Sequence, residues 1–202
     1  MPWLRTAALS LSVRGGIAAE PHGREGLSGL VCEMVQRGAG RFSSRGLVAA
    51  QDNLGIDRSA GVTSAMVSFG AAMPAESLQQ AINLYADVVR RPHLPSDQIE
   101  DARMMSMQEL RAMEDEPTHR VMRRLRQLHY GDILGRSTYG TEAGIEAISE
   151  EDIRRFYKRH YHAGGATLAV AGRVGVGRVV AVRDASPARV AAVKIDAVSQ
   201  GP

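Results

Sequence analysis

The side chains in this chain that could serve either as catalytic groups or as metal ligands include one cysteine and a closely spaced pair of histidines. Cys32 is the only cysteine among 202 residues, so it cannot form an internal disulfide. A free thiol can be a nucleophile or a metal ligand. Because Cys32 lies on an apolar helix, we favour instead a structural role, in which it packs as a small, half-buried side chain. His160 and His162 could bind a metal from an extended strand. Their position at a helix end instead favours an interaction with the negative end of the helix dipole.

A basic run follows Pro117, and several methionines precede it. The run predicts a solvated helix face, because acidic residues stand before it and no aromatic residues alternate with it to stack on bases. Its members are His119, Arg120, Arg123, Arg124 and Arg126. The methionines favour irregular core packing, with a surface that faces a peptide or a subunit as the alternative. They are Met104, Met105, Met107 and Met113.

Composition and charge limit the class of protein. Hydrophobic residues make up 44% of the chain and charged residues 23%, which is typical of a globular domain. The formal net charge of +3 implies no large field for nucleic acid. No apolar run approaches the ~20 residues of a membrane span, and the first residues are too polar for a signal peptide. We therefore expect a cytoplasmic protein that has neither a nucleic-acid nor a membrane partner.

Hydrophobic periodicity predicts helices between strands. Leu9, Leu11 and Val13 alternate with serines and indicate a strand, and the segments 56–60, 63–72 and 166–171 are also expected to be strands. Helices are expected over 27–38, 43–53, 74–91, 96–115 and 121–131 and from Ser149 onward, with a loop at 132–140. The pattern predicts an α+β domain of two layers, in which helices cover one face of a mostly antiparallel sheet. This domain spans 1–172, and 173–202 is expected to be a tail or a linker remnant.

Three blocks of sequence resemble the pitrilysin–insulinase group of zinc metallopeptidases (peptidase family M16). The first begins with Gly26-Leu27 and ends at Gly38. The second runs from Ser77 to Pro117, and the third from Tyr139 to Gly172. The resemblance implies a helix-covered sheet, which agrees with the periodicity. A typical family subunit contains two such domains, and this chain has room for one.

The resemblance also locates the positions at which the family binds zinc. Its motif His-x-x-Glu-His supplies two ligands and a general base from one helix, and a later glutamate is the third ligand. In this sequence those positions read Gly29, Cys32, Glu33 and Glu109, so that Glu109 alone is retained. The family commonly has an acidic residue seven positions before the third ligand, and this chain has Ala102 there. We therefore expect no catalytic residue and no bound cofactor, although zinc is the cofactor of the family. Glu33 and Glu109 are expected to face each other without a cation.

Three functions remain open on this basis. The favoured one is a non-catalytic subunit or fragment that binds peptides or assembles with a zinc-bearing homologue, with self-association as another form of partnership. The second is an active metalloendopeptidase with an altered metal site, formed by Glu109 with Cys32, Glu33 or a distant histidine. The third is a truncated product without independent function.

Overall fold

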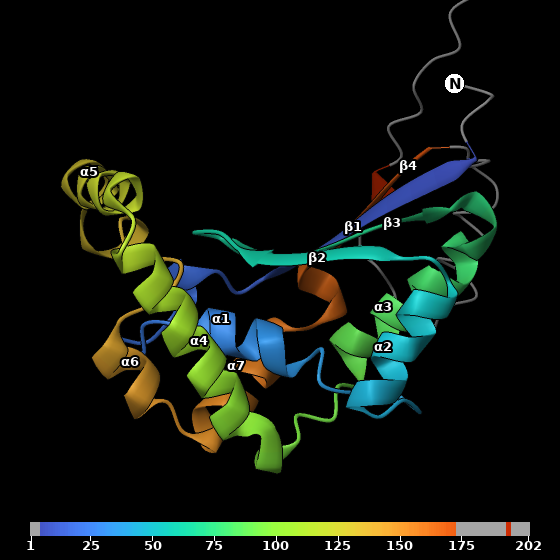
Figure 1. Cartoon of the computed structure of the whole chain (residues 1–202), viewed down its shortest axis with the longest axis horizontal. Helices are drawn as coiled ribbons and strands as arrows, with labels where there is room; N and C mark the ends of the chain where they lie inside the picture. Colours follow the sequence, from blue (N-terminus) through green and yellow to red (C-terminus); the bar gives the residue numbers. More distant parts are fainter. Residues whose placement is uncertain (1–4, 173–192, 195–202) are drawn as a thin grey trace, which may run out of the picture.

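The computed structural model describes residues 5–172 and 193–194 (Figure 1). The strands are β1 (Thr6–Arg14), β2 (Asp57–Val62), β3 (Met66–Pro74), β4 (Ala166–Gly172) and β5 (Val193–Lys194). The helices are α1 (Leu27–Met34), α2 (Ser44–Asn53), α3 (Leu78–Arg90), α4 (Ile99–Glu114), α5 (Pro117–Leu134), α6 (Glu142–Ala147) and α7 (Glu150–His160). Short 3-10 turns occur at Ile17–Ala19, Ala75–Ser77, Ser96–Gln98 and Ala163–Gly165.

The strands form one sheet in the order β2-β3-β1-β4-β5. All pairings are antiparallel except that of β5, which runs parallel to β4. In the central strand, Leu11 lies opposite Phe69 of β3 and Leu168 of β4. All three side chains are buried, because residues directly opposite one another on neighbouring strands point to the same face of the sheet.

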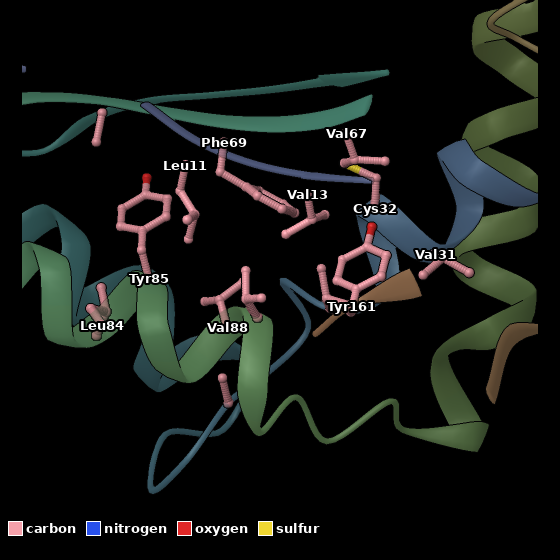
Figure 2. Close-up of a cluster of buried hydrophobic side chains, with 14 of the residues drawn as sticks. Leu11, Val13, Val31, Cys32, Val67, Phe69, Leu84, Tyr85, Val88 and Tyr161 are labelled. Atoms are coloured by element: carbon pink, nitrogen blue, oxygen red, sulfur yellow. The ribbon is translucent and has the colours of Figure 1, made fainter. Parts of the chain in front are cut away.

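The helices other than α5 form a second layer under one face of this sheet, and α5 stands beyond one end of it (Figure 1). Leu11, Val13 and Phe69 point from the strands toward Tyr85 and Val88 of α3 (Figure 2). The opposite face carries small side chains that remain exposed, namely Ala8, Ser10, Ala72 and Ala169. The predicted two-layer α+β architecture is therefore confirmed.

Helix α7 begins with the capping box that the sequence predicts. The Ser149 hydroxyl accepts a hydrogen bond from the Asp152 backbone N–H at 3.1 Å, and the Asp152 carboxylate accepts one from the Ser149 N–H at 3.0 Å. These bonds satisfy backbone donors that the first turn of a helix leaves without partners. Arg24 also donates to the Asp152 carboxylate at 2.9 Å and so ties the start of α7 to the segment that precedes α1.

Several predicted details were wrong. Helix α1 ends at Met34, whereas the sequence suggested Gly38, and 132–134 belong to α5 and not to a loop. Within α5, Gly131 takes φ 71° and ψ −164°, which kinks the helix where it was expected to end. Helix α6 was not predicted. Met104 and Met105 are exposed, which agrees with the surface position that the sequence left as the alternative and not with the favoured core packing. The large apolar residues of α5 are exposed as well.

The predicted tail, 173–202, lies outside the described residues except for Val193 and Lys194, which form β5. Among the helices described, none is both long enough and apolar enough to cross a membrane.

Candidate functional site

Helices α1 and α4 bring the four sequence-predicted positions to one cavity. Gly29, Cys32 and Glu33 of α1 and Glu109 of α4 all line a cavity of about 540 Å³. Its other walls include residues 60–62 of β2, which is an edge strand of the sheet, together with Met105 and Met113 of α4. We call this space the acidic cavity.

The start of α1 is held by Glu20, a residue that the sequence analysis missed. Its carboxylate is buried and accepts hydrogen bonds from the backbone N–H groups of Ser28 at 2.8 Å and Gly26 at 3.3 Å. Burial raises the pKa of Glu20 although these two bonds and the nearby Arg136 favour its charged form. No sequence signal marks this role, because Glu20 lies in the loop before the helix and reaches the helix N-terminus only through the fold.

One carboxylate of the acidic cavity already has a cationic partner. Arg37 donates from Nε to the Glu33 carboxylate at 3.1 Å, one turn further along the chain. The same guanidinium contacts Met105 Sδ at 3.1 Å. Glu33 is therefore neutralised from within the protein, which is a different environment from that of an open metal ligand.

Glu109 has no ion-pair or hydrogen-bond partner among the described residues. Partial burial raises the pKa of its carboxyl group, and the negative charge of Glu33 raises it further. A carboxylate pair with a single arginine leaves the cavity with a net negative charge. The cavity is thus suited to a cationic group.

Removal of the Glu109 charge is expected to change the pH dependence of stability. Because the pKa of Glu109 is higher in the folded than in the unfolded state, the folded state binds the proton more tightly. The contribution of Glu109 to stability therefore falls as the pH rises from the unfolded-state pKa through the folded-state pKa. Glu109→Gln should therefore match the wild type near pH 3 and exceed it at pH 7. We expect a gain of up to about 0.5 kcal/mol, since the side chain is partly solvated. Urea unfolding at both pH values measures it, and an equal difference at the two would contradict the assignment.

Cys32 lies with its side chain in the core, beside Val67 and Tyr161 (Figure 2). Burial raises the pKa of its thiol to about 12, and the charges of Glu33 and Glu109 act in the same direction. The thiol therefore stays protonated at neutral pH, where a nucleophile or a metal ligand needs the thiolate.

Native Cys32 is expected to react with Ellman's reagent far more slowly than free cysteine at pH 7.5, because its thiolate fraction is much lower and its side chain is buried. The same protein unfolded in urea serves as the control and should react at the rate of free cysteine. Rapid reaction of the folded protein would show instead that Cys32 is accessible and ionised.

Among the residues that the structure describes, His160 and His162 have no third metal ligand beside them. The His160 ring packs against Phe156 with the centroids 4.5 Å apart, and burial lowers the pKa of His160. Across 5–172 and 193–194, no group of three or more His, Cys, Asp or Glu side chains is placed to hold a metal ion. Ala102, which the sequence analysis placed where the family commonly has an acidic residue, is fully buried in the core.

Comparison with known proteins places this geometry in a family. The model of the insulinase family (peptidase family M16) matches residues 2–142. An uncharacterized zinc protease of Rickettsia felis is 23% identical over 181 residues, which cover 89% of this chain and 44% of that protein. The probable mitochondrial-processing peptidase subunit beta of Arabidopsis thaliana is 23% identical over 84% of this chain and 32% of its own length.

A solved structure shares the fold. It is described as an inactive domain of peptidase family M16 from Pseudomonas fluorescens, and it superposes with a TM-score of 0.80 at 19% identity over 90% of this chain and 45% of its own. This chain therefore spans less than half the length of the curated relatives named above and of this structure. The match to the family model, which covers most of the chain, shows that the protein belongs to the insulinase family of peptidases.

Proposed function

We propose that this chain is a non-catalytic insulinase-family domain that binds extended peptides and works beside a zinc-bearing member of the family. The observation that carries the proposal is the set of side chains at the family's zinc positions. Gly29 offers no ligand, Glu33 is ion-paired with Arg37, and Cys32 is a buried, protonated thiol. Catalytic zinc sites use imidazole, thiolate or free carboxylate ligands around an open position. These residues do not fit that requirement.

The edge of the sheet supports peptide binding. Within the described residues β2 pairs only with β3, and its side chains are almost all exposed. The free edge of a strand presents backbone N–H and C=O groups that an extended peptide can pair with. Because Ala60, Gly61 and Val62 also line the acidic cavity, a peptide on β2 would pass directly over it.

The relatives support the partnership. The Arabidopsis protein is named as a subunit, and the Pseudomonas domain is described as inactive. A domain that retains the family core and keeps only one of the three zinc ligands is suited to complete a peptide-binding surface for a catalytic homologue. A second copy of the chain is the alternative partner.

Metal content tests the first half of the proposal. The purified protein is loaded with zinc, desalted and measured by elemental mass spectrometry, and we expect much less than one zinc per chain. Near-stoichiometric zinc would overturn the proposal.

Two matched fluorescent peptides test the second half. Both have the same neutral, extended sequence, and one carries N-methyl groups on alternate backbone amides, which removes donors needed for strand pairing. We expect the unmodified peptide to bind and the N-methylated one to bind much more weakly. Equal binding, or the absence of binding by both, would contradict pairing with β2.

An altered-site metallopeptidase is the second candidate, because Cys32, Glu33 and Glu109 share the acidic cavity. It requires bound metal and peptide cleavage that is lost in Glu109→Ala. Cleavage by the wild type that Glu109→Ala abolishes would favour this candidate over the non-catalytic one.

A further inference from the structure

A second cavity lies between α5, the end of α4 and the turn that follows α5. Its volume is about 330 Å³, and residues 135–139 form one wall. Helix α5 stands at one end of the molecule, above α4 (Figure 1). We call this space the arginine cavity, because its lining includes Arg120, Arg123, Arg126 and Arg136 together with His119.

The positive charge of this cavity is neutralised only in part. No carboxylate is among the described residues that line it. Arg123 pairs with Glu114 at 3.0 Å, and His119 lies 3.5 Å from the Glu116 carboxylate. Arg136 donates to the backbone carbonyl oxygens of Asp132 and Glu20 and lies near the carboxylates of Glu20 and Glu25. Arg126 has neither an ion pair nor a side-chain hydrogen bond within the described part of the chain. Guanidinium groups without carboxylates are ready to bind an anion in a bidentate manner.

The remaining walls suit a carboxylate on an apolar stem. Leu110, Met113 and Met122 provide apolar contact, and Ser137 and Thr138 provide hydroxyl donors. A cavity of this kind can hold an aliphatic side chain together with its charged end.

The arginine cavity adjoins the acidic cavity. Met113, Thr138 and Tyr139 line both spaces, so an extended ligand that occupies one could reach the other past these side chains. The two spaces carry opposite charges, because Glu33 and Glu109 line the first and the arginines line the second. A polyphosphate backbone that continued past the arginines would meet these carboxylates. A peptide, whose charged side chains can alternate in sign, meets no such repulsion.

We propose that the arginine cavity binds the carboxylate of an acidic residue in the peptide whose backbone pairs with β2. The proposal rests on the proposed function and deepens it, since it names the class of peptide. The backbone of such a peptide would pair with β2, and its acidic side chain would extend past Tyr139 into the arginine cavity.

Fluorescence anisotropy with the full chain provides the test. The probes are two labelled peptides of equal length that differ only in carrying two glutamates or two glutamines. We expect the glutamate peptide to bind about three- to tenfold more tightly in low salt and to lose this advantage in 0.5 M NaCl. Arg126→Gln should remove most of the preference. Arg124→Gln is the matched control, because it makes the same charge change on the same helix but does not line this cavity.

Each outcome has a defined meaning. Equal affinity for the two peptides, or equal losses in Arg126→Gln and Arg124→Gln, overturns the arginine cavity as a site and leaves binding of the neutral peptide intact. Binding of the acidic peptide alone, with loss only in Arg126→Gln, supports the cavity and contradicts the β2 pairing of neutral peptides. A single-stranded oligonucleotide that binds as tightly and is equally sensitive to Arg126→Gln would show that the cavity takes phosphate in place of a peptide carboxylate, and it would overturn the proposal.

Discussion

Zinc binding is expected to appear when Gly29 and Glu33 are both replaced by histidine. The two positions lie one turn apart on α1 and face the same cavity as Glu109, so the double variant places two imidazoles and a carboxylate around one space. The backbone accommodates the change, because an added Cβ at Gly29 would meet the Thr138 carbonyl oxygen at 3.9 Å, an ordinary contact. We expect about one zinc per chain by elemental mass spectrometry. The apparent affinity should be at least about a hundredfold above that of the wild type, because loss of even an outer-shell partner of a metal ligand typically costs about 10–100-fold and this variant gains two ligands.

Two further variants isolate the cause of this gain. Gly29→His alone supplies one imidazole and should bind zinc weakly. Addition of Glu109→Ala to the double variant should lower the affinity again, because it removes the third ligand. If the double variant held no more zinc than the wild type, these three positions would not have the geometry of a zinc site. The assignment of Gly29, Glu33 and Glu109 to the family's ligand positions would then be wrong.

Loss of the Glu20 carboxylate is expected to destabilise the domain more than most single substitutions. Glu20→Ala leaves the backbone N–H groups of Gly26 and Ser28 without their acceptor in a buried place. Each unsatisfied buried donor costs about 1–3 kcal/mol, and we expect a loss of about 2–4 kcal/mol in the free energy of unfolding. Urea unfolding followed by circular dichroism measures it.

Glu20→Gln is the matched control for this effect. It keeps one carbonyl oxygen as an acceptor and removes the buried charge, so its stability should lie between those of the wild type and Glu20→Ala at pH 7. A Glu20→Ala protein within about 0.5 kcal/mol of the wild type, which is typical of surface substitutions, would contradict the role given to this carboxylate.

The sheet and its core were predictable from the sequence because their signal is local. The alternation of Leu9, Leu11 and Val13, and of Val67 and Phe69, identifies the buried face of each strand without knowledge of its neighbours. The capping box at Ser149 is local in the same sense, since donor and acceptor lie within one turn.

The parts that were missed depend on which elements meet. The spacing of Val121, Leu125 and Leu128 on α5 predicts a helix with an apolar side, and the helix is present. Hydrophobic periodicity does not predict whether another element packs against that side. In the structure these residues are exposed. The contact of Glu20 with the start of α1 and the meeting of two oppositely charged cavities at Tyr139 likewise arise from packing between distant segments.

Helix α5 has no buried residue along its whole length, and this has a consequence for folding cooperativity. A helix that contributes little to the core gains little from the core, so its opening requires less free energy than global unfolding. Three of the four arginines that line the arginine cavity, Arg120, Arg123 and Arg126, are carried by this weakly coupled helix. A ligand that binds these arginines stabilises the helical state of α5 by the free energy of its binding. Slower hydrogen exchange in α5 therefore reports that the arginine cavity is occupied, independently of the rest of the domain.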